Sequence, residues 1–210
     1  MPKKQVPLNT LETYLPENCS EEVIYFLNKY KVQLTVTRQR QSILGDYRHA
    51  HLGKTHRISV NGNLNKYSFL ITLLHELAHL FTFEQYGNKV QPHGKEWKNC
   101  FSSILANFIS KKIFPNDIEN ALYKTISNPA ASSCGDENLL RILLKYDKRK
   151  ESHLLVEQVE FGCHFEIKGG RIFRKDELVR KRFKCTELST GKQYLFSGLY
   201  EVVKLKSESL

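Results

Sequence analysis

Two histidines and a glutamate stand together in the segment His75-Glu76-Leu77-Ala78-His79. Residues four apart lie on one face of an α-helix, so the two imidazoles can converge on one metal ion. Glu76 can reach a metal-bound water as a general base without itself being a ligand. This is the H-E-x-x-H spacing of zinc hydrolases, and we take zinc-dependent hydrolysis as the working hypothesis.

The residues around this motif decide between two interpretations of it. The segment Phe69–Phe83 is otherwise apolar at helical spacing, which predicts a buried helix. Burying two imidazoles and a carboxylate costs free energy unless something satisfies them, and a metal would satisfy all three. The alternative is a pair of core histidines without a metal, since H-E-x-x-H also arises by chance.

A catalytic zinc site needs a third protein ligand and one open position. His93 is the main candidate, because it follows the turn at Gly87-Asn88 and opens the next predicted helix, so the chain can fold it back over the metal. Glu96 is the fallback, since carboxylates also bind zinc. Three histidines in a predicted loop and strand are less favoured: His49, His51 and His56.

The elements before the motif predict its scaffold. Ser20 is expected to cap a helix that runs to about Tyr30, and Asn65 to cap the motif helix. Alternating apolar residues predict strands at Val32–Thr37 and Thr55–Val60, and Gly45-Asp46 is interpreted as a turn. The predicted fold is therefore α+β, with a small sheet behind the motif helix. The strand His56–Val60 is expected to offer an edge to which an extended substrate adds.

The last third of the chain differs from the rest in its amino-acid composition. After helices expected at about 117–126 and 136–146, turn signals such as Gly169-Gly170 divide residues rich in Val, Phe and Tyr. We predict a small antiparallel β module, with domains at 1–146 and 147–210. Its strands are expected near 154–160, 163–168, 171–184 and 193–205.

The chain is basic, with a net charge of +10, and from Arg141 onward it has 16 Lys/Arg against 10 Asp/Glu. Such a balance suggests attraction to DNA or another polyanion, although a solvated surface has the same composition. Aromatic side chains interleaved with the charge could stack on bases or form the module's core. They are Phe161, Phe165, Phe173, Phe183 and Tyr194.

Several classes of protein are not expected. No run of eighteen apolar residues predicts a membrane span, and MPKKQVPLNT lacks the apolar core of a secretory signal, so we expect a cytoplasmic protein. The cysteines are odd in number and widely spaced, which argues against disulfides and against a cysteine-type zinc site. They are Cys19, Cys100, Cys134, Cys163 and Cys185. Nothing in the sequence predicts an oligomeric state.

From about Val23 to Phe108 the chain resembles the SprT-like family of zinc metalloproteases, to which the DNA–protein crosslink protease Spartan belongs. The resemblance lies in three segments: Arg57–Asn61, Leu73–His79 and His93–Trp97, the last similar to the family's H-G-x-x-[FW] segment. It implies a zincin-like domain with one zinc ion held by His75, His79 and His93. It also implies Glu76 as the catalytic carboxylate, a protein or peptide substrate, and action on DNA-crosslinked proteins.

The resemblance, which is to a bacterial-type member, fails at the C-terminus, where many family members end in a zinc ribbon with two cysteine pairs. Lys181–Cys185 resembles the strand that enters the second pair, but Leu188 stands where the partner cysteine would be, and the first pair is missing. One cysteine cannot hold a structural zinc, so the module must depend on its own small core.

Two other functions use the same residues. One is a metal-stabilised but non-catalytic factor that binds nucleic acid or protein through the basic module; Glu76 argues against it, since a structural site needs no base. The other is zinc-dependent hydrolysis of a non-peptide amide.

Overall fold

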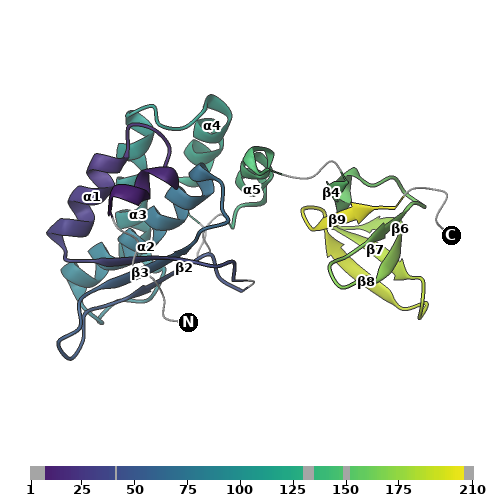
Figure 1. The fold of residues 1–210 in the computed structure, drawn as a ribbon, viewed down its shortest axis with the longest axis horizontal. Helices are drawn as coiled ribbons and strands as arrows, with labels where there is room; N and C mark the ends of the chain where they lie inside the picture. The colour runs from purple at the N-terminus through teal and green to yellow at the C-terminus, as the bar shows by residue number, and fades with distance from the viewer. Residues whose placement is uncertain (1–7, 41, 130–134, 149–151, 206–210) are drawn as a thin grey trace. The chain divides into compact units, whose positions relative to one another are not determined.

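A computed structural model of the chain describes residues 8–40, 42–129, 135–148 and 152–205. It contains two compact units, residues 1–147 and residues 148–210 (Figure 1). The α+β prediction is confirmed: the first unit has helices and a small mixed sheet, and the second has an antiparallel sheet. Among the described residues, no helix is both long enough and apolar enough to cross a membrane.

The first unit is organised around the long helix α2 (Lys66–Tyr86), which carries the H-E-x-x-H motif. Asn65 caps it as predicted, because its Oδ1 accepts a hydrogen bond from the Ser68 N–H at 2.9 Å. Ser20 is the first residue of α1, and Cys19 occupies the N-cap position predicted for Ser20. The other elements of this unit are a 3₁₀ helix (Leu8–Thr13), α1 (Ser20–Lys29), β1 (Gln33–Thr37), β2 (Gly45–Arg48), β3 (Arg57–Asn61), α3 (Lys95–Ser110), α4 (Asn116–Thr125), α5 (Glu137–Leu143) and a 3₁₀ turn (Leu144–Tyr146).

The three-stranded sheet has the order β1-β3-β2. β3 runs parallel to β1 and antiparallel to β2, so it has a neighbour on each side. The expectation that the His56–Val60 strand offers a free edge is therefore wrong. β2 is an end strand instead, and Gly45-Asp46, predicted as a turn, begins it because Gly45 pairs with Val60.

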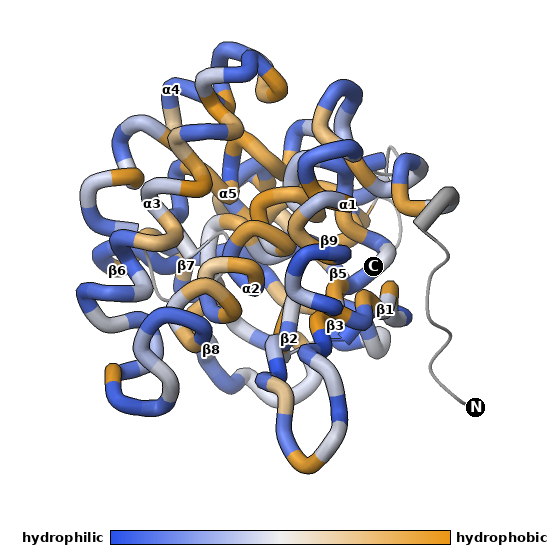
Figure 2. The backbone as a smooth tube through the Cα atoms, turned by 90° about the vertical axis from the view of Figure 1, so that its left-hand side faces the viewer, coloured by the Kyte–Doolittle hydropathy of each residue, from blue (hydrophilic) through white to orange (hydrophobic). Residues whose placement is uncertain are grey.

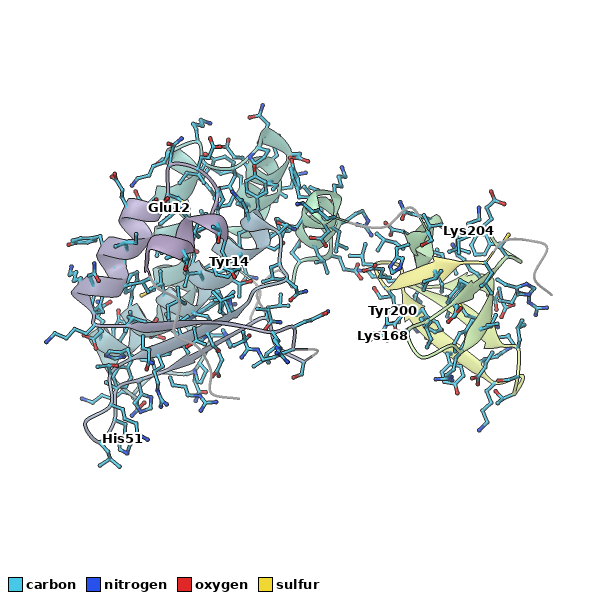
Figure 3. The ribbon with its side chains drawn as sticks, in the orientation of Figure 1. Glu12, Tyr14, His51, Lys168, Tyr200 and Lys204 are labelled. Carbon is cyan, nitrogen blue, oxygen red and sulfur yellow. The ribbon has the colours of Figure 1, made fainter. Side chains whose placement is uncertain are left out.

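The core of the first unit lies between this sheet and the helices. Hydrophobic stretches (orange) run through α2 in Figure 2, and the side chains from Phe69 to Ala78 are all buried. Tyr14, which follows the first 3₁₀ helix and is labelled in Figure 3, stacks on Phe69 with ring centroids 5.3 Å apart. α2 thus packs against β2, β3 and α3, as well as against Tyr14.

The second unit contains six described strands, where we predicted about four. Arg180, at a positive φ of 57°, turns the chain between two strands inside the predicted 171–184 segment. Residues 198–200 likewise divide the 193–205 segment. The elements are β4 (His153–Leu155), a 3₁₀ turn (Val156–Gln158), β5 (His164–Glu166), β6 (Ile172–Val179), β7 (Arg182–Glu187), β8 (Gln193–Ser197) and β9 (Glu201–Lys204), with the sheet order β4-β9-β5-β6-β7-β8.

A small core fills this unit. Phe165 and Phe173 are fully buried within it, so these two cannot stack on bases; Phe161 is 58% exposed. Lys175 is also buried: its Nζ donates to the Val159 carbonyl at 2.6 Å and lies 4.0 Å from the centre of the Phe183 ring. Tyr200, Lys168 and Lys204, labelled in Figure 3, are exposed.

We expect the buried carboxylate of Glu187 to make this unit acid-sensitive. Its hydrogen bonds from Arg171 and from Thr190 lower its pKa to about 2, from an ordinary value of 4.5. The stability that this gives is present above pH 4.5 and is lost as the pH falls towards 2. Hydrogen exchange of peptides from β6 and β7 should accelerate over that range in the wild type. It should already be fast at pH 7 in Glu187→Gln, but not in Glu160→Gln, a matched change at an exposed position.

Candidate metal centre

One turn of α2 separates His75 from His79, so both imidazoles leave the helix on the same side. Trp97 of α3 packs against them, with its ring centroid 4.6 Å from that of His75 and 5.3 Å from that of His79. The His93 ring lies 4.6 Å from the same tryptophan. Trp97 is fully buried and forms an apolar wall behind the three histidines.

The three imidazoles meet through their Nε2 atoms. His93 Nε2 lies 3.2 Å from His75 Nε2 and 3.0 Å from His79 Nε2. Ligand nitrogens at 2.0–2.1 Å from a tetrahedral zinc ion would be about 3.3 to 3.4 Å apart, so the observed separations fit such an ion. Hydrogen bonding alone fits less well, because a neutral His93 has at most one Nε2 proton for two neighbours.

Burial lowers the pKa of all three histidines, which favours the neutral form that metal binding requires. Desolvation, together with the neighbouring histidines, lowers the pKa of His75 to about 3. Desolvation and His93 lower the pKa of His79 to about 4. The cluster therefore presents unprotonated nitrogens at neutral pH, and it is the group of described residues that could hold a metal ion.

His93 reaches the cluster from a tight turn. The Gly94 N–H donates to the Gln91 carbonyl at 2.9 Å, with Pro92 as the second residue of the turn and His93 as the third. His93 has a positive φ of 60°, as the third residue of a type II turn does, although glycine or asparagine is usual there. This strained backbone aims the imidazole back at α2, a feature common at functional sites.

Glu76 is held by the end strand β2. Its carboxylate accepts a hydrogen bond from the Tyr47 backbone N–H, and a Cβ on Gly45 would lie only 2.4 Å from its Oε1. Burial raises the pKa of Glu76 to about 8, with a further contribution from Asp46, while Arg40 and the Tyr47 N–H oppose the rise. Glu76 is thus a buried carboxyl group next to His75 in the chain, with a pKa well above its ordinary value of 4.5.

The Tyr47 side chain lies between the histidine cluster and a hydrogen-bonded row of side chains that continues through His56 to Glu84. Its ring is parallel to that of His79, at an interplanar angle of 2° and a centroid distance of 6.4 Å. Its hydroxyl bonds His56 Nδ1 at 2.9 Å, and His56 Nε2 lies 3.3 Å from Glu84 Oε1. Since the Ala50 N–H also points at His56 Nδ1, the ring proton belongs on Nε2, facing Glu84.

The remaining candidate ligands lie outside the cluster. Glu96, the fallback third ligand, lines a hollow between α1, α2 and α3. His49 stacks on Phe83, with centroids 4.6 Å apart, and His51 is exposed in the loop between β2 and β3 (Figure 3). The structure therefore brings together His75, His79 and His93, with Glu76 beside them.

Two residues beside Glu76 were not singled out from the sequence. The sequence predicts a turn at Gly45, although close backbone approach is an equally good reason for a glycine within a strand. Nothing local marks Tyr47, because its role depends on the pairing of β2 with β3. Pro92 was a usable signal for His93, since proline is favoured as the second residue of a type II turn.

Gly45→Ala is expected to displace Glu76 without removing the histidines. The new Cβ would lie 2.4 Å from Glu76 Oε1 and 2.8 Å from Thr72 Cγ2, so the carboxylate or β2 must shift. A misplacement of this kind costs about 10- to 100-fold in the rate of a reaction that uses Glu76. Turnover and metal content should be measured together; unchanged turnover would contradict this placement of Glu76.

Comparison with known proteins places these residues in a family. Residues 16–119 match the model of the SprT-like family. The chain is similar to Protein SprT of Proteus mirabilis (strain HI4320), with 32% identity over 117 residues that cover 54% of this chain and 66% of that protein. It is also similar to Protein SprT of Glaesserella parasuis serovar 5 (strain SH0165), with 58% identity over 31 residues, 15% of this chain and 19% of that protein.

A third relative is Protein SprT of Vibrio parahaemolyticus serotype O3:K6 (strain RIMD 2210633), with 46% identity over 42 residues, 20% of this chain and 25% of that protein. The matches thus span a little less than two thirds of the Proteus protein and about a fifth to a quarter of the other two. No solved structure matches the chain.

Proposed function

The chain belongs to the SprT-like family, and on that premise we propose that it is a zinc metallopeptidase that cleaves protein chains. The observation that carries the proposal is the convergence of three histidine Nε2 atoms beside a buried glutamate. A site that only stabilised the fold would have no use for that carboxylate.

His75, His79 and His93 would hold the ion, leaving one coordination position open to the reactants. A zinc ion bound there supplies Lewis-acid chemistry, by lowering the pKa of water and polarising a carbonyl oxygen. Glu76 takes the proton of the attacking water and returns it to the leaving amine nitrogen. The Tyr47 N–H orients the carboxylate for both transfers, and Trp97 excludes bulk water from one side.

We propose β2 as the strand that aligns the substrate. It is an end strand of the sheet, and its residues Gly45 and Tyr47 lie beside Glu76. An extended peptide that adds to such a strand is held by backbone hydrogen bonds, which carry little sequence information. The proposal therefore favours unfolded or extended protein segments as substrates, with weak sequence selectivity.

We further propose that the protein acts on DNA-associated or DNA-crosslinked proteins. The net charge of +10 supports attraction to a polyanion, and the resemblance to Spartan suggests DNA. Binding through phosphates would make the association fall steeply as the salt concentration rises.

The test is cleavage of an unfolded protein, such as casein, by the zinc-loaded full-length chain, with and without single-stranded DNA. Cleavage should require metal and should be faster with DNA present. A metal-loaded protein that cleaves no protein under either condition would reject the peptidase proposal. Cleavage that DNA leaves unchanged would reject only the DNA-linked part.

A further inference from the structure

The sheet of the first unit has a second face, opposite α2. Gly45 and Tyr47 of β2 point towards α2, as their contacts with Glu76 and His79 show. Successive side chains of a strand alternate between faces, so Asp46 and Arg48 point to the opposite side. This outer face is separate from the histidine cluster.

Two arginines oppose each other on this outer face. Arg48 of β2 and Arg57 of β3 are direct partners in the antiparallel register. Like charges directly opposite each other destabilise a sheet. Arg48 is partly compensated, because its Nε donates to Asp46 Oδ2 at 2.9 Å.

Arg57 is less well satisfied than Arg48. Its Nε is shielded from solvent and has no hydrogen-bond partner in the described part of the chain. A shielded donor without an acceptor costs free energy, and an acceptor bound beside Arg57 would remove that cost.

The two arginines border a hollow of about 200 Å³. This is smaller than the roughly 300 to 1,000 Å³ of sites for drug-sized ligands, so it suits a small group. Residues of three strands border the hollow, since Thr35 and Gln33 of β1, which both carry donor groups, line it as well. The lining residues are Gln33, Thr35, Asp46, Arg48, Arg57, Ile58 and Ser59.

We propose that this hollow binds a phosphate group between Arg48 and Arg57. Guanidinium groups bind phosphate and carboxylate through paired N–H donors. A tetrahedral phosphate has four acceptor oxygens for donors arriving from three strands, whereas a carboxylate has two oxygens in one plane. Asp46 holds Arg48 in place and leaves the pair with a net charge of +1, which one phosphodiester charge balances. The group belongs either to free phosphate or to a nucleic-acid strand.

The first test is calorimetric titration of the full-length chain with inorganic phosphate, at an ionic strength held constant with chloride. Arg57→Gln and Arg48→Gln should each weaken phosphate binding at least tenfold. Arg38→Gln, a matched loss of one charge at an exposed position before β2, should leave it unchanged. Phosphate bound elsewhere, including at a metal held by the histidines, would persist in Arg57→Gln, and that result would overturn the proposal.

Folding of the variants can be checked independently. Arg57→Gln removes a like-charge pair and an unpaired shielded donor, so circular dichroism should show a folded chain. Arg48→Gln tests the site without altering position 57. Loss of phosphate binding in both folded variants supports the site. Equal phosphate affinity in the wild type and both variants overturns it, as does absence of binding to the wild type.

A second titration with a single-stranded oligonucleotide identifies the source of the phosphate. If the phosphate belongs to a nucleic-acid strand, Arg57→Gln should weaken oligonucleotide binding and reduce the slope of log affinity against log salt by about 1. Arg38→Gln should leave the contribution of the hollow to that slope unchanged. Oligonucleotide affinity that is the same in Arg57→Gln and wild type, with phosphate binding lost, assigns the site to free phosphate. Neither titration requires peptidase activity, so the proposal stands or fails separately from the proposed function.

Discussion

Glu76→Gln is expected to lower kcat for peptide hydrolysis by about 10²- to 10⁴-fold, the usual contribution of a general base. The amide has nearly the shape of the carboxylate and can still accept the Tyr47 N–H, but it cannot take up the proton of water. The histidine cluster is unaltered, so metal content should stay the same. Steady-state kinetics on a peptide and elemental analysis of the same sample measure both quantities.

The control for this variant is Glu21→Gln, the same substitution at an exposed position of α1. It should retain wild-type turnover and metal content. A near wild-type kcat in Glu76→Gln would show that Glu76 is not the general base. That result would also contradict the proposed peptidase mechanism, which depends on this base. Loss of metal in Glu76→Gln would instead mean that the carboxylate helps to hold the ion.

His93→Ala is expected to weaken metal binding by more than 100-fold and to abolish turnover. Loss of a supporting residue around a metal typically costs about 10- to 100-fold in affinity, and loss of a ligand should cost more. His75 and His79 alone would leave a two-coordinate site on α2. Competition with a chelator of known affinity measures the change, and helical circular dichroism verifies that α2 remains folded.

Glu96→Ala is the matched control, because Glu96 is the alternative third ligand that the sequence predicts. Glu96 is not part of the histidine cluster, so its removal should leave metal affinity unchanged. If Glu96→Ala released the metal and His93→Ala did not, the ligand assignment would be reversed. His93→Gly adds a further comparison: glycine accepts the positive φ of 60° without strain but supplies no ligand, so it should fold well and bind metal as poorly as alanine.

Features that depend on neighbours along the chain could be predicted from the sequence. The four-residue spacing of His75 and His79 sets their common face once the segment is helical, and the apolar run around them predicts burial. The Asn65 cap and the two strands at 33–37 and 57–61 follow from equally local signals. His93 was found because metal chemistry requires a third ligand.

Features that depend on pairing between distant segments could not be predicted. Alternation shows that a segment is a strand, but not which strands lie beside it, because the same pattern fits a central strand and an edge strand. β3 was therefore expected at an edge but lies between β1 and β2. For a related reason the sequence predicts about four strands in the second unit, whereas the structure has six described strands. Single turn residues such as Arg180 divide the segments that are predicted as continuous strands.

The sequence by itself thus determined which side chains could hold a metal and act as a base, because helix geometry converts spacing directly into position. Only the tertiary structure decided how Glu76 is held, by placing Gly45 and the Tyr47 N–H of β2 against it. It also decided that Arg48 faces Arg57 across the sheet. These contacts are set by strand order and register, which arise from the packing of the whole unit and leave no trace in local spacing.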